Sequence, residues 1–363
     1  MFANRIKKQY ISQFHPQKPQ SKTLKFTAKL FKNPLTQILL FGIFMFVLQF
    51  MAMFGMVETY IMSAIGSTLI YAIISVGFCF LLGYAGLASL GTGGFIGLGA
   101  YLAYFSMVEW GYSYFVALLI TLAVSIVIGV IVGFISLRIE GIYLAILTLG
   151  LSEIIRNLVM VIRPIIRIPL DKLVLFGVEV EKFVIFFVIL AIFLILMLLL
   201  FNFINSPTGR AMVAIKNSTS AAQAMGISLM KYRLFAFIIS IICSTLAGLM
   251  YMMYIRNINA ANSTLLMMVT SLNILGAVVI GGAKSLWGAT FGTFLIYGLQ
   301  PIVLSNIPFF NDNPAFIVMF TGILVVVITM FYPLGFAQML KMLAYKVKLK
   351  VKNHRRYKYG QEE

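Results

Sequence analysis

The stretch SPTGRAMVAIKNSTSAAQAMGISLMKYR (Ser206–Arg233) is a long polar interruption in a chain that otherwise runs from one hydrophobic segment to the next. It carries basic residues and no acid, and alanine is frequent in it. Pro207 is typical of a first helical turn, where its missing N–H needs no partner. Gly226 is suited to end a second helix in the left-handed conformation. The stretch therefore predicts two short helices outside the lipid, broken near Asn217 and Ser218, that offer small side chains for docking.

The composition predicts that the rest of the chain lies in a membrane. Hydrophobic residues make up 61% and charged residues 10% of the 363 residues, whereas soluble domains carry about 25% charged residues. The mean hydropathy is +1.00. Apolar residues form continuous runs and do not alternate with polar ones, which excludes a barrel. We expect an all-α, polytopic helical membrane protein.

The apolar runs divide into about ten membrane segments, some of them short enough to be re-entrant. Ten crossings leave both termini and residues 206–233 on the cytoplasmic side, and the mixed loop 163–182 outside. The expected segments are 35–54, 60–82, 88–107, 114–137, 142–162, 183–204, 233–254, 265–281, 286–304 and 314–332.

The net charge of +18 gathers at the two ends of the chain, because eight of the 28 basic residues precede Asn33 and eight follow Gly335. Basic ends of a membrane protein mark the cytoplasmic side and its anionic lipid. The charge therefore favours lipid over nucleic acid as a partner. We expect a cytoplasmic arm (1–34), a transmembrane domain (35–334) and a cytoplasmic tail (335–363).

Two stretches are rich in glycine: GYAGLASLGTGGFIGLG (Gly83–Gly99), which also holds Ser89 and Thr92, and GAVVIGGAKSLWG (Gly276–Gly288). Glycine lets helices pack closely, and it also permits helix breaks whose backbone groups face a polar cavity. Both interpretations stay open, and under the second Ser89 and Thr92 line a translocation path. Neither stretch has the spacing of a nucleotide-binding loop, so we expect no ATP hydrolysis by this chain.

Three polar side chains inside apolar runs are candidates for function. Glu153 and Arg156, within 142–162, are three residues apart, so that on a helix they are neighbours and can neutralise each other. Ionisable residues in a membrane usually face a bundle interior or water. The pair is therefore either structural or part of a substrate path. Asn273 either bonds across a helix interface or lines the same path.

Four motifs, in order, carry a family resemblance: GYAGLASLGTGGFIGLGAY (Gly83–Tyr101), RIEGIYLAILTLGLSEIIR (Arg138–Arg156), SPTGRAMVAIKNSTSAAQAMGI (Ser206–Ile227) and GGAKSLWG (Gly281–Gly288). The first is similar to the family pattern GYAGQLSLGHAAFFGIGAY, and the last to GGxGSLWG. They resemble the permease subunits of bacterial ABC importers for branched-chain amino acids, and within them the M-type member of the permease pair.

The resemblance implies a transport subunit of the bacterial cytoplasmic membrane that performs no catalysis and binds no cofactor or metal. Its implied partners are an H-type permease, an ATPase dimer that uses the ATP, an extracytoplasmic substrate-binding protein and the bilayer. Because small side chains let a short helix enter a partner's cleft, we expect Ala222 to lie on an exposed docking helix. The residues that match the ATPase-coupling positions of the family are Gly209, Arg210, Ala221, Ala222 and Gly226.

The chain departs from the family pattern at several positions. Thr92 replaces a histidine, and Thr219 and Gln223 stand where glutamates are usual. The same permease type also serves urea and short amides, so the substrate stays open between these and amino acids.

Two further classes of protein are alternatives. An ion-coupled secondary transporter needs titrating groups within the membrane, which only Glu153 and Arg156 offer. A membrane-bound enzyme needs a nucleophile, metal ligands or paired acids, but His15 and His354 lie in the basic ends. Two cysteines, at 79 and 243, have no metal or disulfide spacing.

Overall fold

The computed structural model describes residues 34–136, 141–169, 174–175, 178–179, 182–260 and 263–302, with single positions between 307 and 336. Residues 1–45 and 46–363 form separate units, and every contact described below lies within the second. Nearly all of the predicted arm and tail, and most of the predicted segment 314–332, fall outside the described residues. The described part is all-α apart from four short strands.

Within the described ranges, six helices are long and apolar enough to cross a membrane. Each begins and ends within a few residues of a predicted segment, because an uninterrupted apolar run leaves little choice of boundary. The chain is a multi-pass membrane protein. The six are α3 (Pro34–Met53), α4 (Thr59–Phe80), α6 (Tyr114–Ser136), α7 (Ile142–Ile162), α8 (Lys182–Asn205) and α11 (Leu229–Ile255).

The glycine-rich segments form shorter pieces. The predicted segment 88–107 begins with a non-helical stretch, and its helix α5 (Thr92–Tyr104) is about 20 Å long, too short to span a bilayer alone. Segments 265–281 and 286–304 are likewise divided. Two π-helical turns flank α5: η1 (Leu81–Ala85) and η2 (Phe105–Glu109). Segment 265–281 consists of the 3₁₀ turn η4 (Thr264–Leu266) and α12 (Met268–Gly281). Segment 286–304 consists of α13 (Leu286–Thr293), the π-helical turn η5 (Phe294–Gly298) and α14 (Leu299–Ile302).

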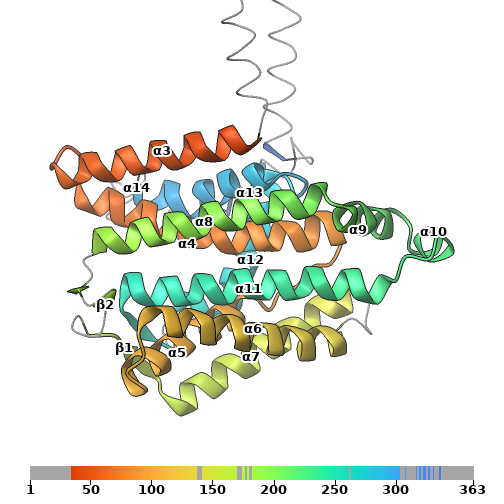
Figure 1. Cartoon of the computed structure of the whole chain (residues 1–363), viewed down its shortest axis with the longest axis horizontal. Helices are drawn as coiled ribbons and strands as arrows, with labels where there is room; N and C mark the ends of the chain where they lie inside the picture. The colour runs from red at the N-terminus through yellow and green to blue at the C-terminus, as the bar shows by residue number, and fades with distance from the viewer. Residues whose placement is uncertain are drawn as a thin grey trace, which may run out of the picture. The chain divides into compact units, whose positions relative to one another are not determined.

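Helix α11 lies at the centre of the second unit and packs against α4, α5 and α6 (Figure 1). Its closest approach is to α5. A side chain at Gly99 would overlap the carbonyl of Thr245, and one at Gly248 would overlap that of Ile96. Glycine on both helices therefore allows their backbones to touch, as close membrane packing requires.

The two ends of these helices differ (Figure 1). At the end that we call the strand end, β1 (Ile165–Arg167) pairs antiparallel with β4 (Asn257–Asn259), and β2 (Val174–Leu175) with β3 (Val178–Glu179). At the other, the α9–α10 end, lie α9 (Pro207–Asn217) and α10 (Thr219–Ala224). The strands in the loop 163–182 were not predicted. Strand β1 pairs with residues far away in sequence, whereas β2 and β3 pair with each other inside the loop.

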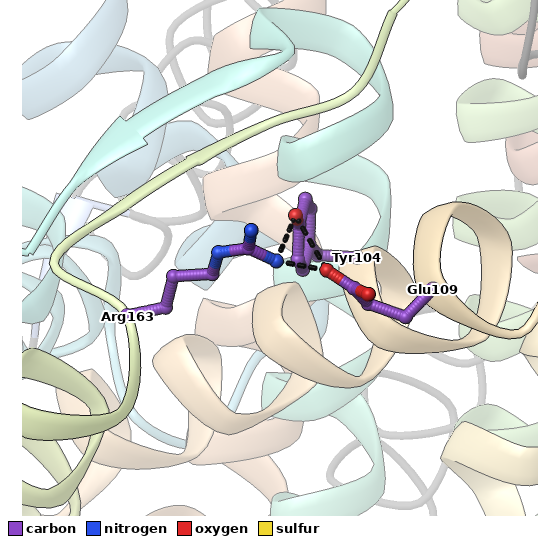
Figure 2. Close-up of polar contacts among 3 residues, drawn as sticks. All are labelled: Tyr104, Glu109 and Arg163. Carbon is purple, nitrogen blue, oxygen red and sulfur yellow. Dashed lines mark hydrogen bonds and ion pairs between the residues drawn. The ribbon is translucent and has the colours of Figure 1, made fainter.

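A polar cluster ties two elements together at the strand end (Figure 2). Arg163, which follows α7, forms an ion pair with Glu109 and donates to the Tyr104 hydroxyl at 2.6 Å. That hydroxyl donates to Oε1 of Glu109 at 3.0 Å. The charge of Arg163 is therefore neutralised within the chain, and the cluster fastens η2 to the end of α7.

Candidate functional site

A helix break lies between α4 and α5. The chain turns at Gly86 (φ 73°) and is not helical again until Thr92. In a membrane the freed N–H groups need partners from the protein. Hydroxyl groups of α7 and α12 supply them: Leu90 N donates to Thr148 Oγ1 at 3.0 Å, Gly93 N to Ser271 Oγ at 3.0 Å and Gly94 N to Ser152 Oγ at 2.7 Å.

Sequence analysis did not single out these hydroxyls. One feature of the sequence could have indicated these hydroxyls. In α7, Thr148 and Ser152 are four residues apart, so they lie on the same face of a mostly apolar helix. For Gly83–Gly99, both open interpretations are right in part. The break exists, and Gly94 also packs tightly against the backbone of Ser152.

Two of the residues predicted for the path, Ser89 and Thr92, are buried in and beside the break. Ser89 is 3% exposed, and its Oγ accepts from Gly91 N at 3.4 Å. Thr92 is 2% exposed, and its Oγ1 has no hydrogen-bond partner in the described part of the chain. In this conformation both hydroxyls face protein.

Glu153 and Arg156 lie beside the break on α7 and neutralise each other, as predicted. Arg156 Nε is 3.1 Å from Glu153 Oε2, within ion-pair range although not aligned as a hydrogen bond. Their side chains are 35% and 22% exposed, so the pair is only half-buried. Ser152, the neighbour of Glu153, is buried against α5. The pair is thus at the edge of the α5-facing surface of α7.

Asn273 is exposed on α12 and lies near Tyr297 of η5, whose hydroxyl donates to the Thr270 carbonyl at 3.4 Å. The Tyr297 ring stacks on that of Tyr71 of α4, with centroids 3.8 Å apart. Asn273 thus lies close to a helix interface, and both predicted roles, bonding across that interface and lining a path, stay open.

The junction of α8 and α9 follows the predicted helix start. Ser206 caps α9, accepting from Gly209 N at 3.4 Å, and Pro207 follows it. A side chain at Gly209 would overlap the carbonyl oxygens at the end of α8. Arg210 Nη1 donates to the next carbonyl of α8, that of Asn205, at 3.0 Å. Gly209 and Arg210, two of the predicted coupling residues, therefore hold α9 against α8.

Lys216, near the end of α9, connects this helix to the break. Its Nζ donates to the carbonyls of Leu82 and Gly83 in η1, at 3.0 and 2.8 Å. Burial, and then the charge of Lys284, lower the pKa of Lys216. Tyr84 in the same turn donates to the Lys284 carbonyl at 2.9 Å. Helix α9 thus contacts the turn that precedes the break, which in turn contacts the α12–α13 connection.

Helix α10 begins at the predicted break, where the Ser218 hydroxyl accepts from Ala221 N at 3.3 Å. Gly226 ends the segment with the predicted positive φ, 77°. Ala221 is exposed, and Met225 is 68% exposed. The expectation that Ala222 is exposed is wrong: it is 0% exposed, because this side of α10 packs against the chain itself.

Comparison with known proteins shows the family of the chain. The family model described as "Branched-chain amino acid transport system / permease component" matches residues 60–329. The permease protein LivM of the high-affinity branched-chain amino acid transport system is 28% identical over 258 residues, both in Salmonella typhimurium and in Escherichia coli. A probable ABC transporter permease protein of Sinorhizobium fredii, y4mJ, is 31% identical over 94 residues.

The two LivM alignments cover 63% of this chain and 60% of each relative, and the y4mJ alignment 25% and 28%. The chain thus spans about 60% of the length of the LivM proteins that it matches. No solved structure matches it. Because the family model covers most of the membrane helices, the break and the α9–α10 segment, the chain belongs to the family of branched-chain amino acid transport system permease components.

Proposed function

We propose that the chain is the M-type permease subunit of a bacterial ABC importer for branched-chain or related amino acids. It forms the translocation path with a second, H-type permease, and it receives substrate from an extracytoplasmic binding protein. An ATPase dimer docks at the α9–α10 end. The observation that carries this proposal is the Lys216 contact, which joins a helix outside the candidate spans to the turn before the break.

In this mechanism the ATPase dimer hydrolyses ATP, and the permease makes no covalent bond and needs no cofactor. The exposed side of α10 contacts the ATPase, and the two states of that dimer place α10 differently. Because α9 is fixed to η1 by Lys216, its displacement moves the turn that precedes the break. The protein thus converts differential contact with two ATPase states into two states of the path.

The proposed orientation places the α9–α10 end in the cytoplasm, together with the arm 1–34 and the tail 335–363. The strand end then faces outward, toward the binding protein. Ten segments, some of them the short pieces around the breaks, make up the domain 35–334. The excess of basic residues at both ends of the sequence supports this orientation.

Ser89, Thr92, Glu153, Arg156 and Asn273 are the side chains proposed for the path. Ser89 and Thr92 would become accessible when the break moves, and the half-exposed Glu153–Arg156 pair would meet substrate or the second permease. Glu153 is the only acid in the six candidate spans of the described residues and is already paired. This weighs against an ion-coupled transporter, which needs a free titrating group.

Uptake into proteoliposomes tests the function. The chain would be reconstituted with a second permease and an ATPase, and uptake of leucine would be compared with that of urea and acetamide. We expect leucine uptake that requires ATP and the binding protein. Uptake of urea alone would assign the amide-transporting branch instead, and leucine uptake driven by an ion gradient without ATP would overturn the proposal.

A further inference from the structure

At the strand end, a cavity of about 400 Å³ lies among α3, α4, α8 and α11. None of its described lining residues is acidic, and Glu58, which precedes α4, is exposed and does not line it. The lining combines apolar side chains with a lysine, an amide and two hydroxyls: Gln49, Ala52, Met53, Thr59, Met62, Ser63, Lys182, Phe183 and Tyr254.

Lys182 supplies the cavity with a positive charge. Its Nζ donates to Ser63 Oγ at 3.1 Å and lies 4.9 Å from the centre of the Tyr254 ring. The charge of Arg256, at the end of α11, also acts on it. At the same end of the molecule, Arg163 is neutralised by Glu109 (Figure 2). The cavity therefore carries the positive charge of Lys182 with no acid among its described lining residues, and it is suited to an anion.

Gln49 supplies a second, independent feature. This residue is only 6% exposed, and its Oε1 is buried without a hydrogen-bond partner among the described residues. A buried amide oxygen without a partner costs free energy, so the cavity also suits a ligand that brings an N–H or O–H donor.

The surroundings of Gln49 indicate where such a ligand comes from. Phe50 and Met53 on the same helix, and Phe54 directly after it, are each at least 49% exposed. These apolar side chains offer a surface for acyl chains directly beside the polar cavity. A ligand with an anionic group, a donor and hydrocarbon chains is a phospholipid.

We propose that this cavity binds the head group of a phospholipid, with the phosphate at Lys182 and Ser63 and the terminal amine or hydroxyl donating to Gln49. Phosphatidylethanolamine and phosphatidylglycerol both have this chemistry. Phosphatidylcholine has the phosphate but lacks the donor, because its nitrogen carries no hydrogen. The site therefore prefers the first two lipids over the third.

Native mass spectrometry of the purified full-length chain, incubated in detergent with each lipid in turn, tests the proposal. Wild type is expected to retain one molecule of phosphatidylethanolamine or phosphatidylglycerol at least about tenfold better than phosphatidylcholine. Lys182→Met should reduce retention of all three lipids. Gln49→Leu should remove only the preference, because it deletes the acceptor and keeps the phosphate contact.

Lys231→Met, at the opposite end of α11, is the matched control and should retain lipid as wild type does. If Lys182→Met does not fold, the loss of preference in Gln49→Leu still decides the matter. Equal retention of the three lipids by wild type and Gln49→Leu would overturn the proposal, since the lipid would then be ordinary annular lipid. Displacement of the lipid by leucine would also overturn it, by making the cavity part of the substrate route.

Discussion

Helices α9 and α10 are adjacent in one polar stretch, but they are held in different ways. Helix α9 buries Gly209, Met212 and Ile215 and binds η1 through Lys216. Helix α10 buries Ala222 alone and exposes Ser220, Ala221, Gln223 and Ala224, as well as Met225 after it. The difference indicates a division of labour. Under the proposed function, helix α9 belongs to the body of the permease and would transmit movement, whereas α10 would offer its exposed side to the ATPase.

Gly209→Val should have the largest effect. Its side chain would overlap two backbone carbonyls at the end of α8, which cannot move aside as side chains do. We expect a loss of about 3 kcal/mol, the upper end of overpacking costs, and much less extractable protein. Size-exclusion profiles and thermal unfolding in detergent measure this. Gly150→Val, at a helical glycine with no neighbour within 4 Å, is the control. Equal yields of the two variants would show that α9 is not anchored to α8.

A pair of tryptophan substitutions separates the two sides of α10. Ala222→Trp should destabilise the segment by about 1–3 kcal/mol, because a fully buried site must accept an indole. Ala221→Trp should fold normally and lose co-purification with the ATPase, because Ala221 is exposed. Protease sensitivity near residue 222 and ATPase pull-down report the two outcomes. Normal ATPase binding by Ala221→Trp would exclude this side of α10 from the contact.

The burial of Ala222 illustrates what one sequence can predict. Local signals succeeded: Pro207 and Gly226 marked the ends of the segment, and the spacing of Glu153 and Arg156 predicted their ion pair. Signals that depend on distant residues failed. Whether Ala222 faces the chain or a partner depends on tertiary packing, which its own neighbours in sequence do not reveal.

The helix break was predictable only in part. The density of glycine suggested a break somewhere in Gly83–Gly99, but the apolar residues in this stretch predicted a helix that begins at residue 88. The hydroxyls that hold the break are 58 and 178 positions away in sequence. Likewise, the local sequence suggests that the charge of Lys216 faces solvent. The carbonyls that it contacts lie 133 and 134 residues away in sequence.

Lys216→Met should have an intermediate effect that is confined to coupling. It removes the two hydrogen bonds to η1 but leaves the exposed surface of α10 unchanged. We expect normal ATPase co-purification, continued ATP hydrolysis and ATP-driven uptake lowered about tenfold, the effect of about 1.4 kcal/mol. Lys216→Arg, which keeps the donors, should restore part of the uptake. Unchanged uptake in Lys216→Met would show that α9 does not act through this contact.

Met225→Ser should have the smallest effect. The side chain is exposed at the end of α10, so the stability of the permease should not change. Burial of a methionine in an interface contributes about 1.5–3 kcal/mol, so affinity for the ATPase should fall about tenfold or more. Surface-immobilised permease and soluble ATPase give this affinity directly. An unchanged affinity would move the contact away from this end of α10.

The division of labour between α9 and α10 is tested most directly by the accessibility of single cysteines. Cysteine is introduced at Ala221 or, as the reference, at Thr208, and a membrane-impermeant maleimide is added to inside-out vesicles with and without the ATPase. The native Cys79 and Cys243 are buried and contribute little background. We predict that the ATPase slows labelling at position 221 by about tenfold or more and leaves position 208 nearly unchanged. Equal labelling at position 221 with and without the ATPase, or protection at position 208 alone, would contradict the account.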